Sequence, residues 1–259
     1  MKQLIGVALG NDLDPISHAQ SVGADCVQIQ VGDPQGWGKP AVSYPGGAAG
    51  LKKDAKAAKI PFYVHAAYVI NVASTNNRIR IPSRKLLQST LDFAHELGAL
   101  GVVVHGGHVT KDDDPDQGFE NWKKCVDQLD FKVPVLIENT AGGSHAMART
   151  KENLENLWQA VGHSEVGFCL DTCHAWAGGW EMKTLVKDVL AITKRVDLIH
   201  SNGSKDKADS GRDRHDNFES SLLPKELVLK TVKDAKANTV CETNLDFVDK
   251  DIEYLRSSI

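Results

Sequence analysis

The chain has few cysteines, no excess of positive charge and no long apolar run. Its 259 residues include five cysteines and no Cys-x-x-Cys pair, which argues against a disulfide framework and a thiolate zinc site. The net charge of −4 excludes a protein that coats nucleic acid through bulk positive charge. No apolar run approaches the roughly 20 residues that span a bilayer, and residues 1–9 are typical of a first strand rather than a signal peptide. We therefore expect a cytoplasmic protein that makes no membrane contact.

The chain does contain a regular alternation of short β-rich runs with amphipathic helical patterns. Apolar residues make up 41% of the sequence and charged residues 25%, which excludes a disordered chain. Helical periodicity is clearest at 86–98, 154–162 and 226–232. The predicted strands are 4–9, 26–31, 61–65, 102–105, 133–138, 166–171, 197–200 and 239–242.

Eight strand-then-helix units in a chain of this length predict a single (β/α)8 TIM barrel that covers residues 1–259. A doubly wound open sheet is the structural rival. It usually carries a glycine-rich phosphate loop after its first strand, and the sequence at 10–14, Gly-Asn-Asp-Leu-Asp, is not such a loop. No internal repeat, linker or low-complexity stretch divides the chain.

Six of the predicted strands end in a side chain that can bind a metal ion. These residues are His65, His105, Glu138, Asp171, His200 and Glu242. The carboxyl ends of barrel strands form one rim, which in this fold carries the active site. Further possible ligands follow these strand ends in the sequence. His174 lies three residues after Asp171, and an Asp213-x-His215 pair follows the seventh strand. Imidazole and carboxylate without thiolate suit zinc at a catalytic site, or manganese or iron, and suit magnesium less well.

Some of these residues also have a purely structural explanation. A lone His105 in an apolar run is commonly a satisfied core histidine, and Asp171 could cap the following helix. Glu138 is harder to explain in that way, since an unpaired carboxylate at the end of a buried strand is costly. His108 and His145 are interpreted as neighbours of the rim or as solvent-exposed residues.

Seven segments distributed along the chain carry a family resemblance. They are VHAAYVIN (64–71), VVHGGH (103–108), LIENTAGGS (136–144), CLDTCHAWAGG (169–179), HSNGSK (200–205), SGRDRH (210–215) and CETN (241–244). Together they resemble the endonuclease IV family of apurinic/apyrimidinic (AP) endonucleases, especially its shorter bacterial members. LIENTAGGS, CLDTCHAWAGG and GRDRH are highly specific in combination, whereas HGGH or CETN alone is a weak signal.

The resemblance implies a TIM barrel that holds three zinc ions through nine protein ligands, with manganese as a possible substitute. All nine ligand positions match in this chain. The implied groups are His65, His105 and Glu138 for one ion, Glu138, Asp171, His200 and Glu242 for a second, and His174, Asp213 and His215 for the third. Glu138 and Glu242 are the residues expected to act most directly in catalysis.

The implied activity is hydrolysis of the phosphodiester 5′ to an abasic site in duplex DNA, leaving a 3′-hydroxyl, with trimming of blocked 3′ ends. We expect the enzyme to act as a monomer. Tyr68 matches a family tyrosine that inserts into the DNA stack, although a half-buried loop aromatic explains it equally well. Gln35 and Trp37 follow the second strand, where family members also reach into DNA. Basic residues expected on rim loops, as phosphate contacts or as a solvated charged face, are Arg78, Arg80, Arg84, Lys85, Lys205, Lys207, Arg212 and Arg214.

Three departures from the family pattern leave two rival functions open. The segment 6–10 is Gly-Val-Ala-Leu-Gly and lacks the histidine of the family's Gly-Ala-His-Val-Ser. Residues 202–203 are Asn-Gly where the family has Asn-Asp. Residues 217–221, Asn-Phe-Glu-Ser-Ser, stand where the family usually has glycines after the Asp-x-His loop. One rival is a sugar isomerase or epimerase of the xylose isomerase type, which uses one or two ions. The Asp213-x-His215 loop argues against it, since a third metal is superfluous for isomerisation. The other rival is a damage-binding protein that has lost turnover.

Overall fold

The computed structural model describes residues 2–143 and 145–259, so Ser144 of the LIENTAGGS segment and Met1 lie outside the described residues. Eight parallel strands close into a barrel in the order β1-β10-β7-β6-β5-β4-β3-β2. They are β1 Ile5–Leu9, β2 Cys26–Gln30, β3 Phe62–His65, β4 Val102–His105, β5 Val135–Glu138, β6 Gly167–Asp171, β7 Leu198–His200 and β10 Asn238–Cys241. The prediction of a (β/α)8 TIM barrel is confirmed, and every predicted strand lies within two residues of its expected bounds.

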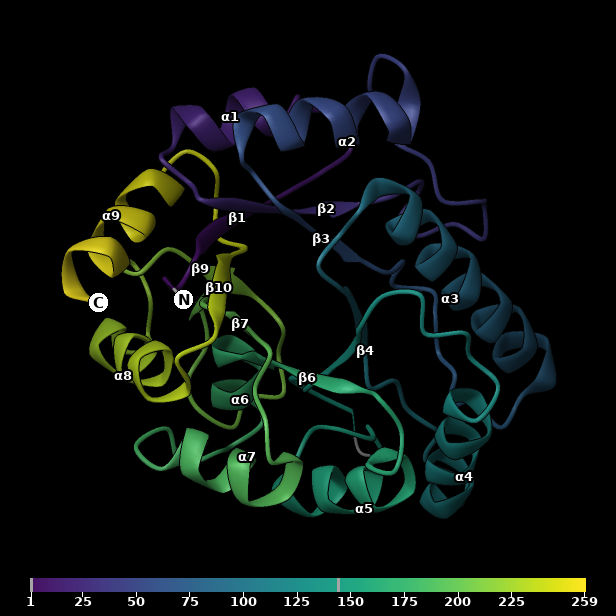
Figure 1. Cartoon of the computed structure of the whole chain (residues 1–259). Helices are drawn as coiled ribbons and strands as arrows, with labels where there is room; N and C mark the ends of the chain where they lie inside the picture. Colours follow the sequence, from purple (N-terminus) through teal and green to yellow (C-terminus); the bar gives the residue numbers. More distant parts are fainter. Residues whose placement is uncertain (1, 144) are drawn as a thin grey trace.

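Helices form a ring outside the barrel (Figure 1). They are α1 Pro15–Ser21, α2 Gly47–Ala58, α3 Asn77–Leu97, α4 Pro115–Val126, α5 Lys151–Val161, α7 Leu185–Thr193, α8 Lys225–Ala235 and α9 Val248–Ser258. The short helix α6, Thr172–Ala177, lies inside this ring, directly after β6. The helical pattern predicted at 86–98 is the second half of α3, which ends at Gly98 with a left-handed φ of 76°. A short antiparallel pair, β8 Gly203–Ser204 and β9 His215–Asp216, lies after β7. In the described part of the chain, none of the helices has the length and apolar character needed to cross a membrane.

The barrel interior is built in layers because alternate residues of a strand point to the same side. One apolar layer contains Cys26, Tyr63, Val103, Leu136, Cys169, Leu198 and Val240. Two positions further along the same strands, in every case, stand Gln28, His65, His105, Glu138, Asp171, His200 and Glu242. The apolar layer therefore closes the barrel beneath a polar layer at its mouth.

A larger apolar core lies between the strands and the helices. Trp122 on α4 is fully buried there, and its indole N–H donates to the Gly106 carbonyl at 2.6 Å. This contact satisfies its polar atom inside the core, so Trp122 is a packing residue of the interior.

All five cysteines are free and buried, and their thiols should be unreactive in the folded protein. Burial raises the pKa of the Cys125, Cys169 and Cys241 thiols to about 12, so the reactive thiolate is scarce at pH 8. We expect Ellman's reagent to react with essentially no thiol in native protein and with all five after denaturation. A thiol that reacts within seconds in the native protein would contradict this burial.

Candidate metal centre

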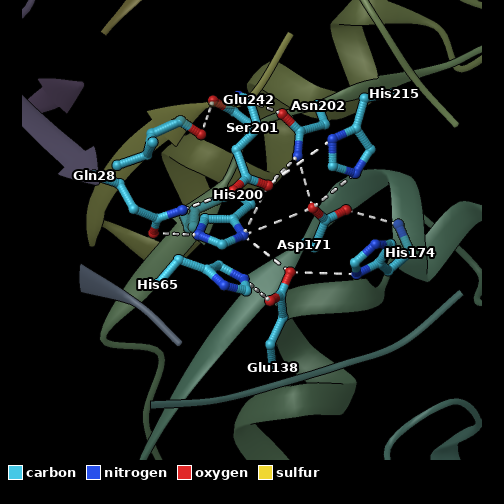
Figure 2. Close-up of polar contacts among 12 residues, drawn as sticks. Gln28, His65, Glu138, Asp171, His174, His200, Ser201, Asn202, His215 and Glu242 are labelled. Atoms are coloured by element: carbon cyan, nitrogen blue, oxygen red, sulfur yellow. Dashed lines mark hydrogen bonds and ion pairs between the residues drawn. The ribbon is translucent and has the colours of Figure 1, made fainter. Parts of the chain in front are cut away.

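The nine side chains expected to bind metal converge at the carboxyl end of the barrel, most of them visible in Figure 2. Their ligand atoms form three groups, within each of which the atoms lie within 4.8 Å of one another. The groups are His65, His105 and Glu138; Glu138, Asp171, His200 and Glu242; and His174, Asp213 and His215. They coincide with the three groups that the resemblance implies, and Glu138 belongs to two of them.

Glu138 at the end of β5 lies at the middle of this arrangement. Its Oε2 is 3.3 Å from Nε2 of both His65 and His105, and its Oε1 is 2.9 Å from Nδ1 of His200. Burial alone would raise the pKa of this carboxyl, but the imidazoles of His200 and His105 outweigh burial and hold the pKa well below its usual value. Glu138 is therefore an ionised carboxylate that presents its two oxygens to different histidines.

Asp171 serves the helix and the site together. Its Oδ1 accepts a hydrogen bond from the backbone N–H of His174 at 2.7 Å and thereby caps α6. Its Oδ2 accepts from the Asn202 amide at 2.7 Å and lies 3.6 Å from Nε2 of His215. Burial raises the pKa of this carboxyl despite the imidazoles nearby. The capping and the metal-site explanations of Asp171 are thus compatible.

The ligand atoms of His174, Asp213 and His215 converge, as the ligands of a single metal ion do. Nε2 of each histidine lies 3.1 Å from the same Asp213 oxygen. Both nitrogens are buried, yet neither makes a hydrogen bond to any residue of 2–143 or 145–259. Buried polar atoms normally have partners, and convergence without hydrogen bonding is expected of atoms that bind a common cation. The residues present therefore fit a divalent metal.

The acidic surroundings keep these imidazoles protonated when no cation is bound. Burial would lower the pKa of His215, but Asp171 and Asp213 raise it to about 9. The pKa of His174 is raised well above its usual value by the same two carboxylates, again against burial. A proton and a metal ion therefore compete for these nitrogens.

Cys173 also lies within reach of Asp171 and His215. Burial raises the pKa of its thiol to about 12, so imidazole and carboxylate are the ligand types most readily supplied at neutral pH.

Two amide side chains that sequence analysis did not assign to the site lie against the ligands. Gln28 on β2 lies 2.8 Å from Nε2 of His200 through its Oε1 and donates to Glu242 Oε1 at 2.6 Å. Asn202 donates to Asp171 and to Glu242, at 2.7 Å and 3.1 Å. A search restricted to metal-binding residue types could not find them. The available signal was a glutamine inside the apolar run Cys-Val-Gln-Ile at 26–29, in step with the strand-end ligands.

Two of the three departures from the family pattern, Gly203 and the segment that contains Ser221, are in contact. Gly203 pairs with Asp216, and a Cβ at position 203 would come within 2.6 Å of the Ser221 Cβ. Ser221 in turn accepts a hydrogen bond from the Ser204 N–H at 2.9 Å. The absence of a Cβ at position 203 therefore leaves room for Ser221 and for the Asp216 carbonyl.

The expected DNA-contacting aromatics stand at the rim. Tyr68 is 53% exposed, and its ring centroid lies 5.4 Å from that of His65. Its hydroxyl accepts from the Gln30 amide at 2.6 Å, and its backbone N–H donates to Pro34. Gln35 is exposed and Trp37 is 49% exposed on the same loop, which follows β2. Tyr68 and this loop therefore form one side of the mouth.

The prediction that the first basic cluster lies on a rim loop is wrong. Asn76 caps α3, so Arg78, Arg80, Arg84 and Lys85 fall inside that helix. Arg78 and Arg80 lie in the first turn, where Arg78 is exposed and Arg80 is half-buried.

The second basic cluster does lie on a loop, between β8 and β9. Lys205 is exposed there. Arg214 donates to Asp206 through Nε at 2.6 Å, and Arg212 lies 3.5 Å from the same carboxylate. Part of the positive charge expected to meet phosphate is therefore neutralised by Asp206.

A cavity of about 380 Å³ opens over the cluster. It is lined by His65, Tyr68, His105, His174, Asp213, His215 and Glu242. The metal-competent groups are therefore accessible to a ligand from the mouth of the barrel.

A closed parallel barrel with these groups at its mouth is typical of the xylose isomerase-like TIM barrels, and the model of that family matches residues 16–258. The chain is also 50% identical over 246 residues to the probable endonuclease 4 of Mycobacterium leprae (strain Br4923), covering 94% of each protein. It is 49% identical over 246 residues to the probable endonuclease 4 of Mycobacterium ulcerans (strain Agy99), covering 95% of each. The chain belongs to the endonuclease IV family of xylose isomerase-like TIM barrels.

Solved structures show how widely this fold is shared. Endonuclease IV from Thermus thermophilus superposes with a TM-score of 0.82 at 23% identity, over 98% of both chains. A D-tagatose 3-epimerase-like protein superposes with a TM-score of 0.81 at 18% identity, over 98% of this chain and 96% of that one. At these identities the likeness establishes the fold alone, and the curated relatives distinguish the family.

Proposed function

We propose that this protein is a zinc-dependent DNA-repair endonuclease that hydrolyses the phosphodiester 5′ to abasic sites in duplex DNA and leaves a 3′-hydroxyl. Membership of the endonuclease IV family supports the class of reaction. The observation that carries the proposal is the division of nine side chains into three groups, two of which share Glu138. A sugar isomerase needs no third group, so this division favours phosphodiester chemistry over isomerisation.

The proposed metal complement is three zinc ions per chain, one for each group, with manganese as a substitute. Five imidazoles and four carboxylates suit zinc better than magnesium. Three divalent cations would more than balance the four carboxylates, so the loaded mouth would attract phosphate although the whole chain is acidic. Zinc, when bound, supplies a water that is nucleophilic at neutral pH and neutralises charge that develops on the phosphate.

The chain's own residues act by positioning and by excluding water. Glu138 holds the two groups it joins at a fixed separation, and Asn202 ties the carboxylates of Asp171 and Glu242 to each other. The apolar layer beneath the cluster is a medium of low dielectric constant, which strengthens the electrostatic interactions above it. We also propose that the same site trims blocked 3′ ends, where a phosphate ester presents the same type of bond. The protein is proposed to act as a monomer.

The test is a nicking assay with zinc-loaded protein and an end-labelled duplex that carries one abasic site. We expect a single nick immediately 5′ to the abasic site, a 3′ end that a polymerase extends, and no cut in the undamaged duplex. Metal content is measured on the same preparation. An intact strand beside a working control nuclease overturns the proposal, and tight binding of the uncut duplex would instead indicate a damage-binding protein.

Tyr68 is expected to contribute to recognition of damaged DNA by stacking. We expect Tyr68→Ala to weaken binding of an abasic duplex by about 5–150-fold, because stacking of an aromatic side chain on a base contributes about 1–3 kcal/mol. Fluorescence anisotropy with an uncleavable abasic analogue measures this change, and metal analysis checks that the centre is retained. Unchanged affinity would leave Tyr68 as a packing residue of the rim.

A further inference from the structure

Gln28 occupies the polar layer of the barrel without being able to bind a metal strongly itself. It stands two residues after Cys26, as His65, Glu138 and His200 stand two residues after members of the apolar layer. Its side chain is 1% exposed, so its amide must find partners inside the barrel. Figure 2 shows it beside His200 and Glu242, at the edge of the cluster.

The contacts of Gln28 determine which way its amide points. A carboxylate accepts hydrogen bonds and cannot donate them, so the amide nitrogen must face Glu242, whose Oε1 lies 2.6 Å away. The amide oxygen then faces Nε2 of His200 at 2.8 Å. An oxygen in this position can only accept, so Nε2 of His200 must carry the proton.

Since Nε2 is committed to Gln28, Nδ1 is the ring nitrogen that a cation would bind, in place of the hydrogen bond that Nδ1 makes with Glu138. Nδ1 lies 2.9 Å from Glu138 Oε1 and 3.1 Å from Glu242 Oε2. It is also 3.8 Å from Asp171 Oδ2, so it faces the other members of its metal group. His200 is completely buried, so water does not compete with these partners for its ring nitrogens.

We propose that Gln28 is a positioning residue of the metal centre, which selects the His200 tautomer with a free Nδ1 and holds Glu242 beside it. The inference rests on the proposed function in that His200 and Glu242 are taken to bind a metal. It extends the site to β2, a strand that supplies none of the nine ligands. Hydrogen-bond partners of metal ligands fix ring orientation and tautomer, and their loss typically weakens metal binding about 10–100-fold.

The neighbouring strand makes this role possible in this chain. Ala8 on β1 is paired in register with Gln28. Its methyl group offers no competing hydrogen bond, and a cavity of about 200 Å³ lies between Ala8, Gln28 and Glu242. The Gln28 amide is therefore free to serve His200 and Glu242.

The test compares Gln28→Met with Gln30→Met in the zinc-loaded protein. Methionine has nearly the length of glutamine and lacks its amide, and Gln30 lies on the same strand, with its amide donated to Tyr68 instead of a ligand. Competition with a chromophoric chelator measures zinc affinity. We expect Gln28→Met to weaken zinc binding at the group that contains His200 and Glu242 about 10–100-fold. Gln30→Met should change the zinc affinity of that group less than about twofold.

A second measurement tests the His200 tautomer in the wild-type protein first, so this part of the test does not depend on a variant that folds. In ¹⁵N-histidine-labelled, zinc-loaded wild-type protein, NMR should show His200 with a hydrogen-bonded proton on Nε2 and a metal-bound Nδ1. Gln28→Met should lose that hydrogen-bonded proton signal. A His200 without a proton on Nε2, or equal zinc affinity of the two variants, overturns the inference while wild-type nicking stands. A wild-type protein that binds no zinc overturns the proposed function and this inference with it.

Discussion

Replacing Glu138 with glutamine is expected to lower the rate of nicking at an abasic site by at least about 1,000-fold. Glutamine keeps the volume of the side chain, so the barrel should fold around it. It removes a carboxylate that belongs to two metal groups, and it leaves His65, His105 and His200 facing a neutral amide. The loss should therefore affect both groups together.

The measurement is a single-turnover nicking rate with protein in excess over the abasic duplex, accompanied by metal analysis. Glu155→Gln is the matched control, because Glu155 lies exposed on α5, the helix that follows the same strand. The control should cut at the wild-type rate. A Glu138→Gln enzyme that also cuts at that rate would remove Glu138 from the proposed mechanism.

Removing the metal is expected to abolish nicking and to destabilise the fold, with a larger loss of stability at higher pH. A ligand present at 1,000 times its Kd stabilises the folded state by about 4 kcal/mol, and chelation removes that contribution. The chelated protein then depends on protonated imidazoles to offset four clustered carboxylates.

The direction of the pH effect follows from the raised pKa of these histidines. The pKa of His215 in the folded protein, about 9, lies above its ordinary value of 6.5. The stabilisation it provides is therefore complete below pH 6.5 and is lost as the pH rises through 9. Metal binding has the opposite dependence, since it requires the deprotonated rings.

The difference in Tm between zinc-loaded and chelated protein should accordingly widen from pH 6.5 to pH 9. Thermal unfolding followed by circular dichroism, at several pH values with and without chelator, measures this difference. Adding zinc back after dialysis is the control for damage by the chelator. A Tm that ignores the chelator, or a difference that narrows as the pH rises, would contradict the assignment of these side chains to a metal centre.

The residues at the strand ends show how much of the site could be predicted from the sequence. Glu138 closes an apolar run, and a buried carboxylate at that point requires partners whatever the rest of the fold. His174 follows Asp171 by three residues, and local capping of α6 alone brings the pair together. Grouping the nine residues into three sets came from the resemblance, because spacing alone left the sets undefined.

Other features depend on contacts that no local pattern encodes. Gln28 meets Glu242 across 214 positions of sequence, so its role follows only from barrel closure. Arg78 and its basic neighbours were misplaced because the Asn76 cap sets the start of α3 earlier than apolar periodicity indicates. Asp206 pairs with Arg214 across a loop that composition describes only as polar.

By itself the sequence determined the alternation of strands and helices, the barrel, and the residue types delivered to its rim. These features are local, since a strand's period of two and its last residue are set by the segment alone. The tertiary structure alone decided which atoms meet, which imidazole nitrogen faces the centre, and which arginines are neutralised. Those outcomes depend on strand register and on loops that bring distant segments together. A shift of a few ångströms in either decides whether a side chain reaches the metal centre.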